Sequence, residues 1–397
     1  MTRFEAPRGT HDIVPGDQAA WRHAVEAAAR VCRLYGYHPI QTPVFEDTEL
    51  FARTAGAGSD VVQKEMYSFQ DRGGRSLTLR PEGTAPIVRA YLEHGMRRLP
   101  QPVKLFTIAP MYRYSAPQRG RYREHWQLSV EAIGSADPAV DAEIIALYAH
   151  LLAELGVSRY ELQLNSIGDR DCRPAYVERL TAWLEQHDEA LDADARQKRA
   201  TSPLRVFDTK NAAVAEALRE APTIGDSLCK ACREHFDEVR GYLDAYGVAY
   251  RLVPTLVRGL DYYTRTTFEF VDEAIGAQSS ICGGGRYDHL AEEIGGAPTP
   301  GIGFGAGIER LLLSLGDDAP AEPPGIDVFF VCDEGADRVA TLAAMMTLRR
   351  RGLASDADYA GRSRKGQLTQ ASRLGAARVV VVDEDTDLAA VVEECLA

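Results

Sequence analysis

Residues 102–134 read PVKLFTIAPMYRYSAPQRGRYREHWQLSVEAIG. Apolar and polar residues alternate through PVKLFTIAPMYRYS and again through REHWQLSVEAIG, which is the period of a strand with one covered face. The basic loop Ser115–Arg123 separates the two runs, so the pattern predicts an antiparallel hairpin. Similar β-rich sequence precedes it at SLTLRPEG and returns at YRLVPTLVRGLDYYTRTTFEFV. Together these runs predict an antiparallel sheet domain.

Helical patterns bracket and interrupt these strands. Amphipathic helices are predicted over QAAWRHAVEAAARVCRLYG, which Gly36 ends, and over DPAVDAEIIALYAHLLAELG. Residues 169–244 become rich in Ala, Glu and Arg, which indicates a helical insertion into the sheet domain.

The C-terminal part has a different pattern. Three prolines and three acids in DDAPAEPPG, residues 317–325, are typical of a linker. Beyond it, IDVFFVC, ADRVATLAAMMTLRRRG, GQLTQASRLGA and ARVVVVD predict a strand, two helices and a buried strand in a largely parallel sheet. We therefore expect an α+β domain over residues 1–318, a linker at 319–325 and a small α/β domain over 326–397.

Composition limits the protein class. The 397 residues suffice for two or three domains, and the net charge of −13, from 45 basic and 58 acidic residues, opposes indiscriminate binding to nucleic acid. The sequence has neither an apolar run long enough to span a membrane nor the apolar core of a signal peptide, and its seven scattered cysteines suit reduced thiols. We expect a cytoplasmic protein with no membrane partner, in which a local basic surface meets any polyanion.

Such a basic surface is predicted around the hairpin loop. From His94 to Arg123 there are seven basic residues and no acid: Arg97, Arg98, Lys104, Arg113, Arg119, Arg121 and Arg123. Guanidinium groups match phosphate oxygens two at a time, so the loop suits phosphate binding. A solvated, charged hairpin is the alternative.

Two further arginines lie beside unusual turns. Arg258 stands in LVRGLDYYTRTTFEF, and Arg310 in GIGFGAGIERLLL, where glycine occupies every second position from Gly301 to Gly307. This alternation suggests a strand that allows close approach of a ligand or of a neighbouring chain segment. The βαβ frame of a dinucleotide site and the G-x-x-x-x-G-K-[ST] phosphate loop are both missing. Nucleotide binding, if present, uses arginines and a sheet.

Several polar side chains are candidates for binding a small polar molecule. Glu82 and Thr84 in LRPEGTA combine a carboxylate with a hydroxyl, and Gln127 and Glu131 are four apart on one face of a strand. Tyr262 and Tyr263 offer a phenol whichever face points inward. Each residue alone is more typical of a structural role, and only their joint occurrence suggests a site.

The segment SLCKACREHF has spacing typical of a zinc site at Cys229, Cys232 and His235. It supplies three ligands where a structural zinc prefers four, and only the distant Cys172 is available as a fourth. We favour a reduced, half-buried cysteine pair and assign no metal ligand here.

In order, these segments resemble the histidyl-tRNA synthetases, a class II aminoacyl-tRNA synthetase family, over nearly the whole chain. RGTHDIVP resembles the N-terminal start of the family and PVFEDTELF its motif 1. LRPEGTA and MYRYSAPQRGRYREHWQLSVEAIG resemble motif 2, and TPGIGFGAGIERLLL resembles motif 3. RGLDYYTRTTFEF and GGGRYDHLAEEIGG resemble two signatures particular to the histidine enzymes.

The resemblance implies activation of L-histidine by ATP, with Mg²⁺, to histidyl-adenylate and transfer to tRNA(His). It places Arg113 and Arg258 at the α-phosphate and Arg310 at the γ-phosphate. It assigns to histidine the residues Glu82, Thr84, Gln127, Glu131, Tyr262 and Tyr263. It assigns to tRNA the basic residues Arg119, Arg121, Arg123, Arg362, Arg364 and Lys365. The last three, in the segment 361–378, are alternatively plain helix surface.

Some features depart from the family pattern or leave alternatives open. Trp126 stands where the family commonly has histidine, and the sequence after ARVVVVD indicates a shortened anticodon-binding domain. Motif 1, with Pro43, implies a homodimer. The main alternative is the synthetase-like regulatory subunit of ATP phosphoribosyltransferase, which generally lacks the C-terminal domain and the intact RGLDYY signature. A scaffolding protein is the third, and it requires that Glu82, Arg113 and Arg310 do not converge on one pocket.

Overall fold

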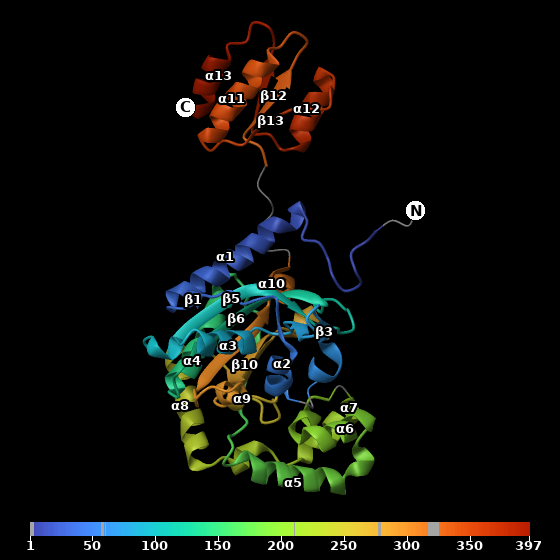
Figure 1. The fold of residues 1–397 in the computed structure, drawn as a ribbon, viewed down its shortest axis with the longest axis vertical. Coiled ribbons are helices and arrows are strands. Elements are labelled where there is room, and N and C mark those ends of the chain that lie inside the picture. The colour runs from blue at the N-terminus through green and yellow to red at the C-terminus, as the bar shows by residue number, and fades with distance from the viewer. Residues whose placement is uncertain (1–3, 57–58, 60, 210, 277–278, 317–324) are drawn as a thin grey trace. The chain divides into compact units, whose positions relative to one another are not determined.

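The computed structural model describes all residues except 1–3, 57–58, 60, 210, 277–278 and 317–324. The chain divides into two compact units, one of Met1–Ile13 and Trp21–Ala319, the other of Val14–Ala20 and Pro320–Ala397 (Figure 1). The predicted linker, 319–325, lies outside the described residues apart from Gly325. In the part of the chain that is described, no helix has the length and apolar character needed to cross a membrane.

An eight-stranded sheet frames the large unit, in the order β1-β5-β6-β11-β10-β9-β7-β8. Its strands are β1 His38–Pro39, β5 Val103–Tyr112, β6 Glu124–Ile133, β7 Glu161–Ser166, β8 Arg251–Leu252, β9 Thr264–Val271, β10 Ser280–Arg286 and β11 Gly301–Gly307. The predicted hairpin is confirmed, because β5 and β6 pair antiparallel from Val103 opposite Ile133 to Tyr112 opposite Glu124. Only the short edge strands β1 and β8 pair in parallel within this sheet as described. The alternating glycines form a strand, as predicted.

Helices cover one face of this sheet (Figure 1). They are α1 Gln18–Leu34, α4 Pro138–Glu154 and α10 Ile308–Leu315. Leu128 and Val130 of β6 and Phe304 of β11 point toward them into one apolar core. Helix α4 is buried along most of its length, because the sheet and a second helix, α8 Lys230–Tyr246, pack against it. The residues between these core positions face the other side of the sheet.

A smaller antiparallel sheet has the order β2-β4-β3, with β2 Phe45–Asp47, β3 Tyr67–Gln70 and β4 Ser76–Leu79. Beside it lie α2 Thr48–Ala55, α3 Thr84–Glu93 and α9 Leu290–Glu293. Before β2, the carbonyls of Thr42 and Pro43 accept hydrogen bonds from the Arg80 guanidinium. Single turns occur at η1 Pro15–Asp17, η2 Val61–Glu65, η3 Met96–Arg98 and η8 Glu273–Ile275.

The predicted insertion is helical. It contains α5 Arg173–Gln186, α6 Ala193–Thr201, α7 Ala212–Ala217 and α8, with turns η4 Asp188–Ala190, η5 Pro203–Phe207, η6 Leu218–Glu220 and η7 Ile224–Ser227. Tyr176, Leu180 and Leu184 of α5 pack with Val206 and Val214 into a separate apolar core. The last helix returns to the sheet domain, since its residues Val239 and Leu243 pack in the main core.

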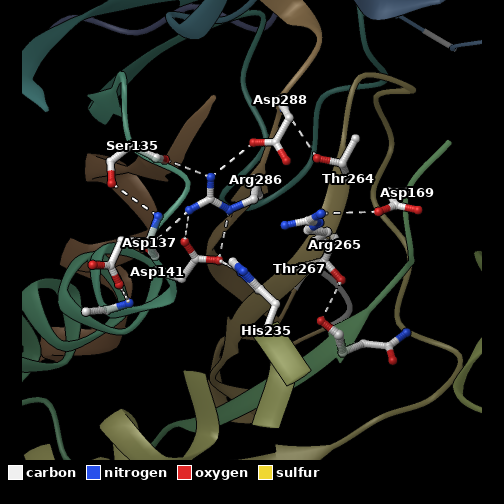
Figure 2. A network of polar contacts seen from close by, with 12 residues as sticks. Ser135, Asp137, Asp141, Asp169, His235, Thr264, Arg265, Thr267, Arg286 and Asp288 are labelled. Atoms are coloured by element: carbon white, nitrogen blue, oxygen red, sulfur yellow. Dashed lines mark hydrogen bonds and ion pairs between the residues drawn. The ribbon is translucent and has the colours of Figure 1, made fainter. Parts of the chain in front are cut away.

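A buried ion cluster joins the last helix of the insertion to the sheet (Figure 2). Arg286 at the end of β10 is fully buried and forms ion pairs with Asp141 of α4 and, at 3.0 Å, with Asp288. His235 of α8 lies 2.9 Å from the same Asp141 carboxylate. Burial raises the pKa of Asp141, but Arg286 and His235 outweigh it and hold this pKa below its usual value. Removing one partner of such a buried pair costs about 3–5 kcal/mol.

The small unit is a three-stranded parallel sheet, as predicted. Its order is β13-β12-β14, with β12 Val328–Cys332, β13 Ser355–Ala357 and β14 Arg378–Val382. Phe330 of β12 faces α11 Arg338–Arg350 and α13 Leu388–Leu396, while Phe329 faces α12 Arg364–Arg373. ARVVVVD forms a strand, β14, as predicted, but the prediction that this strand is buried is wrong, because β14 lies at the edge of the sheet and Val379 is 41% exposed.

Candidate active site

The sheet face opposite α1 and α4 forms the floor of a cavity of about 830 Å³ in the large unit. Its floor includes Gln127 of β6, Gly305 of β11, Gly283 of β10 and Glu269 of β9. The predicted residues that line it are Glu82, Thr84, Arg113, Arg121, Gln127, Arg258, Tyr262, Tyr263 and Arg310. Segments that are up to about two hundred residues apart in sequence therefore meet at one site.

Glycines make room on this floor. A Cβ at Gly305 would lie 2.7 Å from Nε2 of Gln127, one at Gly303 would collide with the Glu131 carboxylate, and one at Gly283 with the Arg258 guanidinium. None of the three has the positive φ that favours glycine. Glycine is required at these positions because side chains from neighbouring segments fill the space that a Cβ atom would need.

The three predicted arginines approach the cavity from different segments. Arg113, just after β5, donates through Nε to the carbonyl of Pro81 at 2.7 Å. Arg310 on α10 donates to the carbonyls of Gly120 at 2.8 Å and Ser280 at 2.6 Å. Arg258 Nη1 lies 2.9 Å from Glu269 Oε1. These contacts fix each guanidinium at the cavity wall, as a preorganised cationic site requires.

The cations crowd one another enough to perturb neighbouring groups. Burial, followed by the charges of Arg113 and Arg121, lowers the pKa of Arg310 to about 10. Burial and the charges of Arg113, Arg310 and Arg121 lower the pKa of His125 to about 3, so this histidine is neutral at pH 7. Such a positive field in a chain of net charge −13 favours an anionic ligand.

A polar pocket adjoins the arginines. The Glu82 carboxylate accepts hydrogen bonds from the peptide N–H groups of Thr84 at 2.6 Å and Ala85 at 2.9 Å. These two N–H groups lie in the first turn of α3, where they have no partner within the helix. The Thr84 hydroxyl donates to Glu131 at 2.7 Å, and the Tyr287 hydroxyl donates to its other oxygen at 2.6 Å. Glu131 is fully buried, lies outside the set of residues lining the cavity, and therefore acts from beneath the floor.

Burial shifts both carboxyls of this pocket. It raises the pKa of Glu82 despite the two peptide donors, and it raises the pKa of Glu131 well above the usual value despite the two hydroxyl donors. Both carboxylates are therefore poorly compensated, and a cationic ligand group in the pocket would stabilise them.

Sequence reasoning missed several wall residues. Alternation along β6 places His125 on the same face as Gln127, and this signal was available. Glu309 lines the cavity beside Arg310 and accepts the peptide N–H of Trp126 at 2.9 and 3.1 Å. The insertion contributes Asp192, Asp194, Lys198, Arg205, Asp208, Thr209 and Asn211, for which no local signal exists.

The residues predicted to contact tRNA differ in their surroundings. Arg119 is exposed, Arg121 lies 2.7 Å from Glu65 at the cavity, and Arg123 stacks over the Tyr114 ring at 3.9 Å. In the small unit Arg362, Arg364 and Lys365 are all exposed, and Arg362 and Arg364 form ion pairs with Asp358 and Asp333. Arg119 and Lys365 are therefore chosen for testing, because both are exposed.

The chain is similar to known proteins along most of its length. A family model described as histidyl-tRNA synthetase matches residues 9–311. A histidine–tRNA ligase of Moorella thermoacetica is 50% identical over 381 residues, covering 96% of this chain and 90% of that protein. The ligase of Halothermothrix orenii is 47% identical over 382 residues, covering 96% and 91%. The apo histidyl-tRNA synthetase of S. aureus superposes with a TM-score of 0.82 at 36% identity, covering all of both chains.

The chain belongs to the histidyl-tRNA synthetase family. The resemblance found in the sequence is thereby confirmed, as is the α+β fold. A Bacillus halodurans structure described as an ATP phosphoribosyltransferase regulatory subunit/histidyl-tRNA synthetase has a TM-score of 0.69 at 24% identity over 96% of this chain and shows the fold alone. Trp126, where the histidyl-tRNA synthetases commonly have histidine, faces away from the cavity and packs against Trp21, with ring centroids 5.8 Å apart.

We predict that Gly303→Ala destabilises the protein. The new Cβ would overlap the buried Glu131 carboxylate, and overpacking of this kind lowers the free energy of unfolding by about 1–3 kcal/mol. Urea unfolding followed by circular dichroism measures the change. The control is Gly241→Ala on α8, where a Cβ meets nothing within 4 Å and better helix propensity should stabilise by up to about 1 kcal/mol. Equal stability of the two variants would contradict the packing argument.

We also predict a pH-dependent gain of stability in Glu309→Gln. Burial raises the pKa of Glu309 from 4.5 to about 7, so the folded protein loses stability as pH rises through this range and does not regain it above. The glutamine has no charge but keeps an oxygen that accepts the Trp126 N–H. At pH 8 the variant should be more stable than the native chain by on the order of 1–3 kcal/mol, and at pH 4.5 about equally stable. Urea unfolding at both values tests this, and a pH-independent difference would exclude it.

Proposed function

We propose that the cavity binds ATP and L-histidine side by side, with Arg113, Arg258 and Arg310 around the triphosphate. The observation that carries this proposal is the convergence of the three arginines with Glu82, Thr84 and Gln127 on one cavity. The reaction is that of the family: the chain activates L-histidine with ATP to histidyl-adenylate and transfers the histidyl group to tRNA(His).

The chemical difficulty of the first step is that two anions must meet. The histidine carboxylate oxygen forms a bond to the α-phosphorus while the bond to the pyrophosphate oxygen breaks. We assign Arg113 and Arg258 to the charge that develops on the α-phosphate oxygens, and Arg310 to the γ-phosphate. A preorganised donor of this kind contributes on the order of 3 kcal/mol to the transition state. In the second step a hydroxyl of the terminal tRNA ribose attacks the acyl carbon, and AMP leaves.

The polar pocket is assigned to histidine. Glu82, Thr84 and Gln127 are proposed to hold the ammonium group, whose charge suits the buried Glu82 carboxylate. Tyr262 and Tyr263, whose rings are 4.6 Å apart at the cavity wall, are proposed to border the imidazole. Glu131 acts on the same subsite by fixing Thr84 and Tyr287. A site built on such hydrogen bonds rejects analogues that lack the polar group by roughly 10⁴ to 10⁵, so no editing site is required.

Mg²⁺ is proposed to enter with ATP, bridging the β- and γ-phosphates as part of the substrate. Glu309 fits this role, because its buried carboxyl beside Arg310 has a raised pKa, and a divalent cation would stabilise its charged form.

We further propose a twofold dimer through the small sheet that carries motif 1. Phe45 on β2 and Phe69 on β3 are 50% and 45% exposed, and their rings form an edge contact at 6.3 Å. Val44 beside them is 40% exposed. An aromatic patch of this kind on a soluble domain is typical of an interface.

We also propose a cytoplasmic location. All seven cysteines are free, and free thiols are typical of the reducing environment of the cytoplasm.

For tRNA we assign the motif 2 loop to the acceptor end and the small unit, residues 326–397, to the anticodon stem. A specific observation favours the synthetase over the regulatory-subunit alternative: RGLDYY is intact, and its Arg258, Tyr262 and Tyr263 all line the cavity.

Aminoacylation of purified tRNA with each of the amino acids in turn tests the function, and we expect charging with histidine alone. Arg258→Ala should lower histidine-dependent ATP/pyrophosphate exchange by at least about 10²- to 10³-fold, because an α-phosphate ligand is lost, while circular dichroism stays unchanged. The matched control is Arg251→Ala, an exposed arginine paired with Glu161, which should exchange normally. Normal exchange by the Arg258 variant would refute its assigned role.

We predict that Arg119→Ala and Lys365→Ala weaken tRNA binding without affecting adenylate formation. Each exposed cation that meets a phosphate releases a counterion, so each variant should raise the KM for tRNA several-fold and reduce the salt slope of charging by about one unit. Charging assays from low to high salt measure this, with pyrophosphate exchange in the absence of tRNA as the internal control. A salt slope like that of the native chain would remove the residue from the tRNA surface.

A further inference from the structure

Four potential metal ligands meet where the insertion joins the sheet domain. Asp169, Cys172, Cys229 and Cys232 each offer one atom, and these atoms all lie within 4.8 Å of one another. His235, the third residue of the zinc-like spacing in the sequence, is not among them, because its Nε2 is 2.9 Å from Asp141 in the buried ion cluster. Asp169 stands in its place, and Cys172, which is distant in sequence, lies close enough to be the fourth ligand.

The spacing within the group fits a tetrahedral zinc site. With Zn–S bonds of about 2.3 Å and a Zn–O bond of about 2.0 Å, tetrahedral geometry places two sulfurs about 3.8 Å apart and a sulfur and an oxygen about 3.5 Å apart. The Cys172 and Cys232 sulfurs are 3.9 Å apart, and Cys172 Sγ is 3.5 Å from Asp169 Oδ1. The two sulfurs are too far apart for a disulfide, whose bond is about 2.05 Å. Soft sulfur ligands with one carboxylate select zinc over magnesium or calcium.

Local structure brings these ligands together. Cys172 is the N-cap of α5, Cys229 is the N-cap of α8, and Cys232 follows one turn later. A Cβ at Gly168 would lie 2.7 Å from Cys172 Sγ, so the glycine permits the tight approach of the chain before Asp169. Cys172 and Cys232 are buried while Cys229 is only partly so, which leaves an entry path for the ion.

Outer contacts hold the carboxylate ligand. Arg265 reaches the second oxygen, Oδ2, of Asp169 at 3.3 Å (Figure 2), and the peptide N–H of Asp171 donates to Oδ1 at 3.0 Å. Hydrogen bonds of this kind to the oxygens of a ligating carboxylate fix its orientation toward a metal ion.

We propose that Asp169, Cys172, Cys229 and Cys232 form a structural Zn²⁺ site that closes the base of the insertion. Cys172 and Cys232 are 60 residues apart in the chain, so one ion would join the start of the insertion to its last helix. Arg173, next to Cys172, donates to the carbonyl of Tyr263 at 2.6 Å. The site would therefore also steady the segment that carries the cavity tyrosines.

The first test is the metal content of the full chain, purified without chelators or a histidine tag. Elemental analysis should find about one zinc per chain in the native protein and about a tenth or less in Cys172→Ser and Cys229→Ser. The matched control is Cys332→Ser, a half-buried cysteine in the small unit, which should keep its zinc. A chain without zinc, or equal zinc in all variants, would overturn the proposal.

Cobalt substitution tests the ligand set itself. The Co²⁺-loaded native chain should show the intense visible bands of a tetrahedral site and thiolate charge-transfer absorption. Cys229→Ser binds metal more weakly and loses it on purification, but at saturating Co²⁺ its charge-transfer absorption per bound ion should be lower by about a third, because one of three thiolates is lost. Asp169→Asn should keep the thiolate absorption but bind Co²⁺ at least tenfold more weakly. Circular dichroism verifies that each variant is folded. Octahedral spectra, or a Cys172–Cys232 disulfide found by mass spectrometry in the freshly purified chain, would exclude the site.

Discussion

The missing side chains on the central strands β10 and β11 are the constraint on which the rest of the site depends. Gly283, Gly303 and Gly305 leave space that Arg258, Glu131 and Gln127 fill, so the polar groups of the cavity lie directly against the backbone. On the opposite face, Gly284 leaves room for the Phe268 ring in the core. Two adjacent strands thus admit large side chains from their neighbours on both faces, and substitution of any of these glycines forces one of those side chains to move.

The charged groups around this floor destabilise the protein when no substrate is bound. Burial, followed by the charges of Arg113 and Arg121, lowers the pKa of Arg310 to about 10, and buried Glu82 and Glu131 lack full compensation. A polyphosphate and an ammonium group would relieve both costs, since each brings the opposite charge. The apolar core and the compensated Arg286–Asp141 pair lie on the other side of the sheet. A site that is stabilised by its substrates must rest on such a core.

Features that follow from local periodicity could be predicted from the sequence. The β5–β6 hairpin, the glycine strand and the parallel sheet of the small unit were found in this way, and the family signatures led to the arginines. Contacts between distant segments left no local signal: His235 pairs with Asp141 across 94 residues, and Asp208 reaches the cavity from the insertion. Strand β13, three residues long, is too short to show a period, and only its pairing with β12 defines it.

Hydrogen bonds connect the helical insertion to the segment that carries Tyr262 and Tyr263, and this connection places the insertion beside the cavity. Arg173, at the first turn of α5, holds the carbonyls of Ile167, Gly168 and Tyr263 with a single guanidinium. Any rotation of α5 would therefore move the backbone beside Tyr262 and Tyr263. At the other end, α8 is fixed to α4 through His235 and Asp141. With both ends fixed, Asp208 and Asn211 keep defined positions at the cavity wall, so the insertion shapes the pocket.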